Sequence, residues 1–221
     1  MSTADLVSRL LEVEVSALCD ADKSLPVLAP EIRALVPDVR MAGPAFTVVA
    51  EDDHLPVLSA LAEAAAGDVL VIAANGHRRA VLGELFTTEA RRRRLAGVVV
   101  DGWCRDLQGL RRIGLPVFSR GVSPMAGSTV ARPPLRRPVQ VGGVAAAPGD
   151  IVFGDDDGVV IAPPDRIAAA LPGAEAIGRA ERAILRAMAG GRGIHELTNW
   201  AEHVGRLDAG GESGLEFRVD A

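Results

Sequence analysis

Hydrophobic and polar positions in the first half of the chain follow two different periods. Short unbroken apolar runs alternate with segments whose apolar residues recur every three or four positions. The unbroken runs are typical of strands buried on both faces of a sheet, and the recurring pattern is typical of amphipathic helices. The strands are expected at 41–50, 69–73, 97–101 and 115–118, and the helices at 55–66, 84–94 and 106–113. This order predicts an α/β domain whose central sheet is covered on its faces.

The two ends of the chain are helical in pattern. Thr3 can cap a first helix that runs to about Asp20. A last helix is expected over 173–189, because Pro172 interrupts the pattern before it and a pair of glycines follows it.

Two further parts of the chain, 120–162 and 194–221, lack this regular alternation of strands and helices. Residues 120–138 are rich in Pro, Ser and Gly and predict a long loop. Short strands separated by turn residues are expected at 139–146, 151–153 and 158–162. We therefore expect one domain over 1–193, followed by a polar, Gly-rich and irregular tail over 194–221.

Composition narrows the class of protein. A chain of 221 residues with 48% hydrophobic residues can bury one well-packed core. The net charge of −5 gives no indication of a nucleic-acid partner, and no apolar stretch is long enough to span a membrane. The N-terminus lacks the basic and then apolar layout of a signal peptide, so the expected location is the cytoplasm.

Counts of reactive residues restrict the chemistry. Lys23 is the only lysine, and it lies in a polar stretch that predicts an exposed loop, so a Schiff base to a carbonyl substrate is not expected. Cys19 and Cys104 are expected to be free thiols, and the four histidines show no spacing typical of metal ligands. Chemistry on a carbonyl group would therefore need a metal or a hydrogen-bonding site.

The most informative segment joins the run at 97–101 to the helix expected from Asp106. In open α/β sheets, ligands bind just beyond the carboxyl ends of strands, which is where Arg105 and Asp106 are expected. The guanidinium of an arginine suits carboxylate or enolate oxygens, and an aspartate offers a hard oxygen ligand for Mg²⁺ or Mn²⁺. An alternative stays open, in which Asp106 only caps the helix and Arg105 is a surface residue.

A second candidate begins at Gly83. A glycine ahead of a helical pattern exposes free backbone N–H groups that can bind a carboxylate, and Glu84 adds a negative oxygen close to them. The alternative is an ordinary helix start in which Glu84 interacts with the helix dipole.

A third candidate is Glu181, which falls in the apolar stripe of the last helix, four positions after Ile177. A carboxylate in such a stripe needs a partner, so Glu181 predicts either a functional site or an ion pair across a subunit contact.

Two segments, Leu95–Asp106 and Gly114–Pro124, closely resemble the RraA-like family. That family includes the regulator of ribonuclease activity A and the aldolases of 4-hydroxy-4-methyl-2-oxoglutarate and 4-carboxy-4-hydroxy-2-oxoadipate. Further segments at 67–71, 83–90 and 148–160 agree with it, and the resemblance covers about 5–190. The most specific part is the Asp-Gly-x-x-Arg-Asp motif that ends at Asp106.

The resemblance implies a single-domain α/β/β/α sandwich that assembles into a homotrimer or homohexamer, with active sites between neighbouring subunits. It implies that Asp106 ligates Mg²⁺ or Mn²⁺ through a water-rich shell and that Arg105 contacts the pyruvyl oxygens. The start of the helix at Gly83, with the backbone of Leu85 and Phe86, would hold the substrate carboxylate.

The resemblance also implies roles for two acids. Glu84 stands where the aldolases have an acid that orients a metal-bound water, and Glu181 is the candidate for an acid that reaches the site from the adjacent subunit.

The activity implied by the resemblance is that of a lyase. Such an enzyme cleaves 4-hydroxy-2-oxo acids to pyruvate, and decarboxylation of oxaloacetate is an expected companion activity because it forms the same enolate. The rival interpretation is a non-catalytic regulator that binds a ribonuclease or another protein, and a third is an enzyme acting on an unrelated small acid or sugar acid. A methyltransferase is not indicated, because no Gly-rich cofactor loop follows the first strand.

Overall fold

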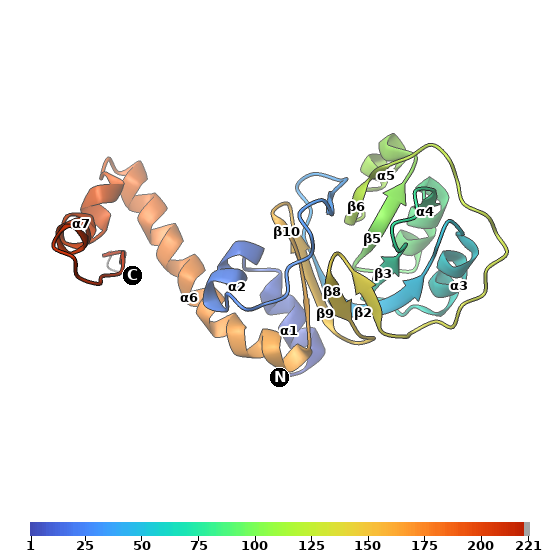
Figure 1. The fold of residues 1–221 in the computed structure, drawn as a ribbon, viewed down its shortest axis with the longest axis horizontal. Helices are drawn as coiled ribbons and strands as arrows, with labels where there is room; N and C mark the ends of the chain where they lie inside the picture. The colour runs from blue at the N-terminus through green and yellow to red at the C-terminus, as the bar shows by residue number, and fades with distance from the viewer. Residues whose placement is uncertain (219–221) are drawn as a thin grey trace.

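A curved mixed sheet of eight strands forms the centre of the molecule, in a computed structural model that describes residues 1–218 (Figure 1). The strands lie in the order β1-β6-β5-β3-β2-β9-β10, and β4 pairs with β5. Their bounds are Arg33–Ala34 (β1), Met41–Val49 (β2), Val69–Ala73 (β3), Ala80–Leu82 (β4), Gly97–Cys104 (β5), Val117–Val122 (β6), Ile151–Asp155 (β9) and Gly158–Ala162 (β10). The segment expected as one strand at 139–146 is instead a hairpin of β7 (Val139–Val141) and β8 (Val144–Ala146).

Helices cover both outer faces of this sheet. The helices are α1 (Thr3–Leu10), α2 (Val15–Ala21), α3 (Leu55–Glu63), α4 (Glu84–Arg92), α5 (Leu107–Ile113), α6 (Pro164–Ala189) and α7 (Trp200–Asp208), with a 3₁₀ turn η1 at Ile194–Leu197. Among residues 1–218, no helix is long and apolar enough to cross a membrane.

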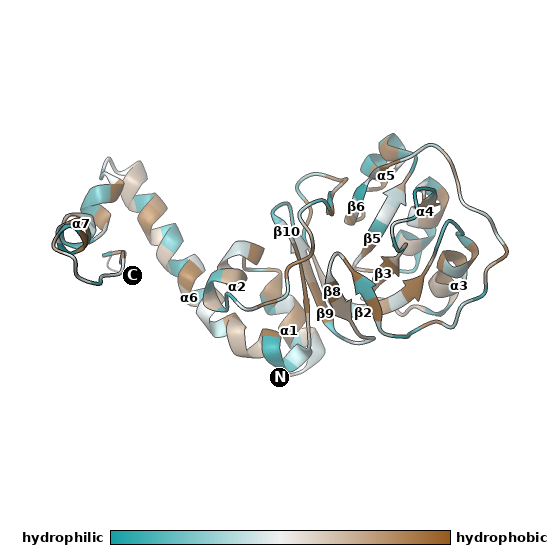
Figure 2. Ribbon diagram, viewed as in Figure 1, coloured by the Kyte–Doolittle hydropathy of each residue, from teal (hydrophilic) through white to brown (hydrophobic). Residues whose placement is uncertain are grey.

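Alternation along the strands divides the buried side chains into three cores. Leu70 and Ile72 of β3 pack in the core that includes α3, α4 and α5, while Val71 between them points into a middle core shared with β9 and β10. Phe153 of β9 packs in the third core, against α1, α2 and α6. The layers therefore run helices, sheet, sheet, helices, which confirms the predicted α/β/β/α sandwich, and Figure 2 shows hydrophobic strands between more hydrophilic helices.

The single N-terminal helix expected to about Asp20 is two helices. The break lies between α1 and α2, where the backbone N–H of Val15 donates to the carboxylate of Asp155 over 2.9 Å. This acceptor comes from a strand 140 positions later, so no local pattern contains it. Ser2, and not Thr3, caps α1 by accepting from the N–H of Asp5.

The last helix begins earlier than expected. The helix α6 runs unbroken through Pro172, so the predicted start at 173 was wrong. Leu171 and Ala174, on either side of the proline, are buried in the core shared with α2. Gly173 packs against α2 so closely that a Cβ on it would stand 2.9 Å from the Cβ of Ala21. Packing of this face outweighs the hydrogen bond that a proline removes from a helix.

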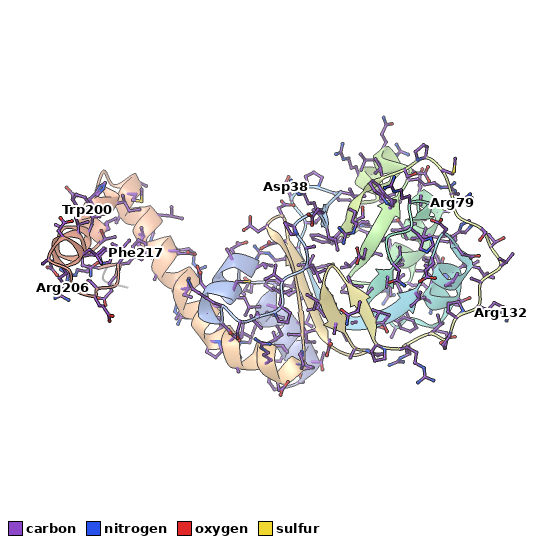
Figure 3. The ribbon with its side chains drawn as sticks, in the orientation of Figure 1. Asp38, Arg79, Arg132, Trp200, Arg206 and Phe217 are labelled. Atoms are coloured by element: carbon purple, nitrogen blue, oxygen red, sulfur yellow. The ribbon has the colours of Figure 1, made fainter. Side chains whose placement is uncertain are left out.

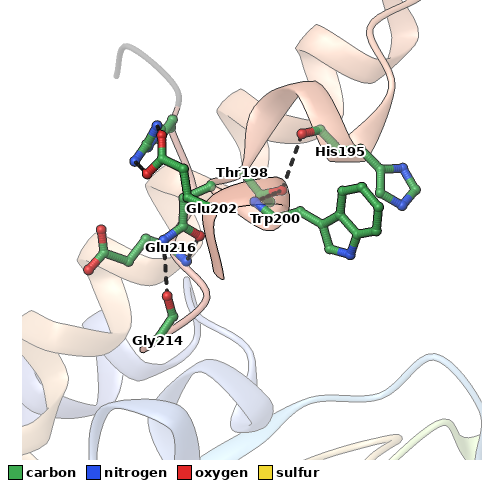
Figure 4. A network of polar contacts seen from close by, with 8 residues as sticks. His195, Thr198, Trp200, Glu202, Gly214 and Glu216 are labelled. Atoms are coloured by element: carbon green, nitrogen blue, oxygen red, sulfur yellow. Dashed lines mark hydrogen bonds and ion pairs between the residues drawn. The ribbon is translucent and has the colours of Figure 1, made fainter. Parts of the chain in front are cut away.

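The second half of α6 leaves the body and carries a small folded tip (Figure 1). The prediction of an irregular tail was wrong, because η1 and α7 form there and Thr198 bridges to Phe217. The side chain of Asn199 stabilises this tip by donating to the carbonyl of Gly214 and accepting from the N–H of Glu216. Figure 4 shows Gly214 and Glu216 close to Thr198 and Trp200.

Candidate active site

A pocket of about 130 Å³ lies just beyond the carboxyl ends of β4 and β5. It is lined by His54, Ala80, Val81, Leu82, Gly83, Leu85, Phe86, Arg105, Asp106 and Ala126. Parallel pairing of β4 with β5 places the start of α4 next to the turn that follows β5. The structure thus brings Gly83, Leu85, Phe86, Arg105 and Asp106 together, although they come from two separate segments of the sequence.

Asp106 occupies the N-cap position of α5, but its side chain makes no capping hydrogen bond to that helix. Its Oδ2 instead accepts from the backbone N–H of Glu84, over 3.1 Å, and lies 3.5 Å from Nε of Arg105. The backbone of Asp106 is left-handed, with φ 59° and ψ 41°, a conformation in which aspartate is enriched. Asp106 therefore stands at the capping position of α5 without capping that helix through its side chain, which is held against the start of α4 instead.

Gly83 allows α4 to approach this pair closely. A Cβ at position 83 would stand 2.6 Å from Oδ2 of Asp106 and 2.9 Å from Cγ of Arg105, distances that real Cβ atoms do not adopt. The next backbone N–H groups, at Leu85 and Phe86, belong to the first turn of a helix and have no acceptor within it. Leu85, Phe86 and Arg105 all line the pocket, so a helix start and an arginine, both suited to an anion, meet there.

Glu84 lies beside this pocket and does not line it. Its carboxylate forms an ion pair with Nη2 of Arg112 over 3.0 Å and packs on Gly109, where any Cβ would overlap it. Glu84 and Asp106 both line a neighbouring trough along the start of α5.

Glu181 stands apart from these residues in the single chain. It is exposed on the second half of α6, one turn before Leu185, whose side chain is 63% exposed. This part of α6 points away from the side of the body that carries α4 (Figure 1).

The sequence analysis did not identify His54 as a site residue. Its ring meets Phe86 edge-on, with 5.7 Å between ring centroids, and it lines the same pocket. A single histidine ahead of a helix has no paired spacing, so the sequence pattern carries no signal for it.

The neighbouring Asp53 fixes the backbone beside His54. Asp53 is 2% exposed and accepts from the Oγ of Ser128 and from the N–H groups of Leu55, Val130 and Ala131. Burial raises the pKa of this carboxyl, but the four hydrogen bonds outweigh it and bring the pKa down to about 2. Asp53 therefore stays charged and ties the loop at 123–138 to the rim of the pocket.

Cys104 is adjacent in sequence to Arg105 but plays no part in the pocket surface. Its side chain is fully buried, and burial raises the pKa of the thiol to about 12. A thiol in this state is a poor nucleophile and a poor metal ligand.

Comparison with known proteins shows the family of the chain. A family model described as Aldolase/RraA, RraA-like, matches residues 15–161. The chain belongs to the RraA-like family. This RraA-like chain is 36% identical over 161 residues to a protein of Halalkalibacterium halodurans named "Putative 4-hydroxy-4-methyl-2-oxoglutarate aldolase", covering 72% of this chain and 77% of that one.

Solved structures share the RraA-like fold. A crystal structure of a protein from Pseudomonas syringae pv. tomato aligns with a TM-score of 0.78 and 26% identity, over 88% of this chain and 93% of that one. The RNA-processing inhibitor RraA from Thermus thermophilis aligns with a TM-score of 0.63 and 28% identity, over 68% of this chain and 92% of that one. Relatives of this RraA-like chain therefore include proteins named as an aldolase and as an inhibitor.

Proposed function

We propose that this RraA-like protein is a divalent-metal-dependent aldolase. It would cleave 4-hydroxy-2-oxo acids, such as 4-hydroxy-4-methyl-2-oxoglutarate or 4-carboxy-4-hydroxy-2-oxoadipate, to pyruvate, and would decarboxylate oxaloacetate as a side activity. The observation that carries the proposal is the meeting of Arg105, Asp106 and the first turn of α4 in one pocket. The relative named as an aldolase supports the same class of reaction.

The donor chemistry of the pocket fits Mg²⁺ or Mn²⁺. Asp106 uses Oδ2 for the N–H of Glu84 and the Arg105 contact, and its side chain remains 42% exposed. Within residues 1–218, no three His, Cys, Asp or Glu side chains gather into a metal cluster, so Asp106 would share the ion with waters and substrate oxygens, as Mg²⁺ sites commonly do. When bound, the cation would supply Lewis-acid polarisation of the 2-oxo group.

The side chains of the chain itself would bind and orient the pyruvyl part. The N–H groups of Leu85 and Phe86 would donate to the C1 carboxylate, and the Arg105 guanidinium would face the C2 oxygen. When the C4 hydroxyl loses its proton, the C3–C4 bond breaks and its electron pair passes into the pyruvate enolate. Arg105 would stabilise the negative oxygen of that enolate. In Schiff-base aldolases, the iminium formed with a lysine accepts this electron pair instead.

Glu84 would assist the proton transfer. Its carboxylate borders Asp106 in the neighbouring trough and is held there by Arg112, so it can orient a water toward the C4 hydroxyl. Glu181 would complete the site only from an adjacent subunit of a homotrimer or homohexamer, because the α6 of one chain points away from its own pocket.

The direct test is pyruvate release from 4-carboxy-4-hydroxy-2-oxoadipate and from oxaloacetate, with Mg²⁺ or Mn²⁺ and then with EDTA. The proposal expects release from both compounds that stops with EDTA. A folded protein that releases pyruvate from neither compound in the presence of metal would overturn the proposal.

A second candidate is a regulator that binds another protein without catalysis. The structural likeness to an RNA-processing inhibitor favours it. A regulator would bind a ribonuclease in the presence of EDTA and would do so equally well after Asp106→Asn. Binding that is unaffected by both changes, with no pyruvate release, would favour this candidate.

A further inference from the structure

Two further hollows lie beside the pocket. Arg105 and Asp106 line both the pocket and a second hollow, whose other wall is the segment 122–124. The same segment lines a third hollow together with Trp103 and Arg78. Each hollow shares wall residues with the next, and we refer to this row of hollows, from Arg105 to Arg78, as the groove.

Strand pairing fixes the two ends of this groove. Trp103 is paired with Ala80 on β4 and with Gly121 on β6, and it lies two positions before Arg105. Arg78 lies two positions before Ala80, so the loop ahead of β4 carries it to the same edge of the sheet. A Cβ at Gly121 would stand 2.9 Å from Cζ3 of Trp103, so only a glycine lets the indole ring lie this close to β6.

The groove has a cation at each end and an apolar middle. Arg105 at the pocket end shares its charge with Asp106, while the ion pairs within residues 1–218 do not include Arg78. Val122, 47% exposed, and Pro124 line the same hollow as the partly exposed Trp103. A substrate with one carboxylate near Arg105 and another beyond an apolar carbon matches this order of charges.

The pyruvyl part, bound beside Arg105, sets the point from which a longer substrate must extend. The groove past Arg105 offers the distal part of that substrate a path with a second cation at its end.

We propose that Arg78 is a specificity-determining residue that binds a distal carboxylate of the substrate, while Trp103 and Val122 contact the carbons before it. This inference rests on the proposed aldolase function. It assigns to the protein a preference for 4-hydroxy-2-oxo acids that carry an additional carboxymethyl group at C4.

Two substrates that differ only in that group provide the test. At C4, 4-hydroxy-4-methyl-2-oxoglutarate has a methyl group where 4-carboxy-4-hydroxy-2-oxoadipate has a carboxymethyl group. Arg78→Gln should lower kcat/KM for the second compound about tenfold, mainly through KM, because one charge-assisted hydrogen bond is lost at a partly exposed site. The same variant should leave kcat/KM for the first compound within about twofold, and Arg78→Lys should retain part of the preference because it keeps the charge.

The matched control is Arg79→Gln, which removes the same charge one position away, at a residue labelled in Figure 3 that does not line the groove. Arg79→Gln should leave kcat/KM unchanged for both substrates. If Arg78→Gln lowers kcat/KM equally for both substrates, or for neither, the proposed role of Arg78 is wrong, while the proposed aldolase activity stands. If the unmodified protein releases pyruvate from neither compound, the aldolase proposal fails, and the subsite fails with it.

Discussion

The backbone N–H of Glu84 donates a hydrogen bond to the carboxylate of Asp106 over 3.1 Å. The residue that precedes α5 therefore holds the start of α4, so the candidate metal ligand and the candidate anion-binding helix start form one unit. The first two predictions concern this unit.

Asp106→Asn should remove metal-dependent turnover without unfolding the protein. Asparagine tolerates the left-handed backbone at this position and keeps an oxygen for the N–H of Glu84, but it removes the negative charge. We expect kcat/KM for pyruvate release to fall by about 10²–10³-fold, the size of effect seen when one electrostatic group of an active site is lost. Thermal unfolding within a few degrees of the unmodified protein, as expected for about 1 kcal/mol or less, is the control. Full activity with normal metal dependence would refute the assignment.

Gly83→Ala should damage the site more than the fold. The added Cβ would push Asp106 and Arg105 apart, whereas the backbone at position 83 is extended and accepts any residue. We expect at least about a tenfold loss of kcat/KM, since small displacements in an active site are costly. Gly205→Ala adds a Cβ into open space and serves as the matched control. Equal activity of the two variants would show that the close approach is not needed.

Asp53 should make the stability of the protein depend on pH below 4. The pKa of Asp53 in the folded protein is about 2, below the ordinary value of 3.8. The charged carboxylate therefore contributes fully to the free energy of unfolding above about pH 3.8, and this contribution is lost as the pH falls through 2. The Asp53→Asn variant should be less stable than the unmodified protein at pH 6. Between about pH 3.8 and pH 2, its free energy of unfolding should fall less than that of the unmodified protein. Urea unfolding at pH 6, 4 and 2.5 measures both effects. The control Asp208→Asn removes an exposed carboxylate and should leave the pH profile unchanged; an Asp53 variant with the same profile would contradict the prediction.

Asn199→Ala should open the C-terminal tip and leave the body intact. The amide of Asn199, 9% exposed, makes two side-chain hydrogen bonds, to Gly214 and Glu216, beside the backbone hydrogen bond from its own N–H to the carbonyl of Glu216. Loss of a buried polar group of this kind costs about 1–3 kcal/mol, which is large for a unit with one small core around Leu197. Hydrogen exchange should therefore accelerate in 194–218 and stay unchanged in β3 and β5. Glu212→Ala, an exposed change in the same loop, is the control, and equal exchange in the two variants would contradict the role of Asn199.

Local patterns were sufficient for the elements whose burial is regular. The apolar runs at 69–73 and 158–162 match β3 and β10, because a strand covered on both faces needs apolar residues at every position. The place of Arg105 and Asp106 at the end of a buried strand also followed from the sequence, as did the free N–H groups after Gly83.

Tertiary structure decided what these elements meet. The break after α1 depends on Asp155, and the continuation of α6 through Pro172 depends on packing against α2, so partners far along the chain overrode local preference. Likewise, β4 was not expected from its short sequence, yet its parallel pairing with β5 brings Gly83 next to Asp106 and places Arg78 near Trp103. Periodicity in a sequence reports which residues are buried, but the register between strands fixes which side chains share a pocket, and that depends on contacts between segments that no local pattern contains.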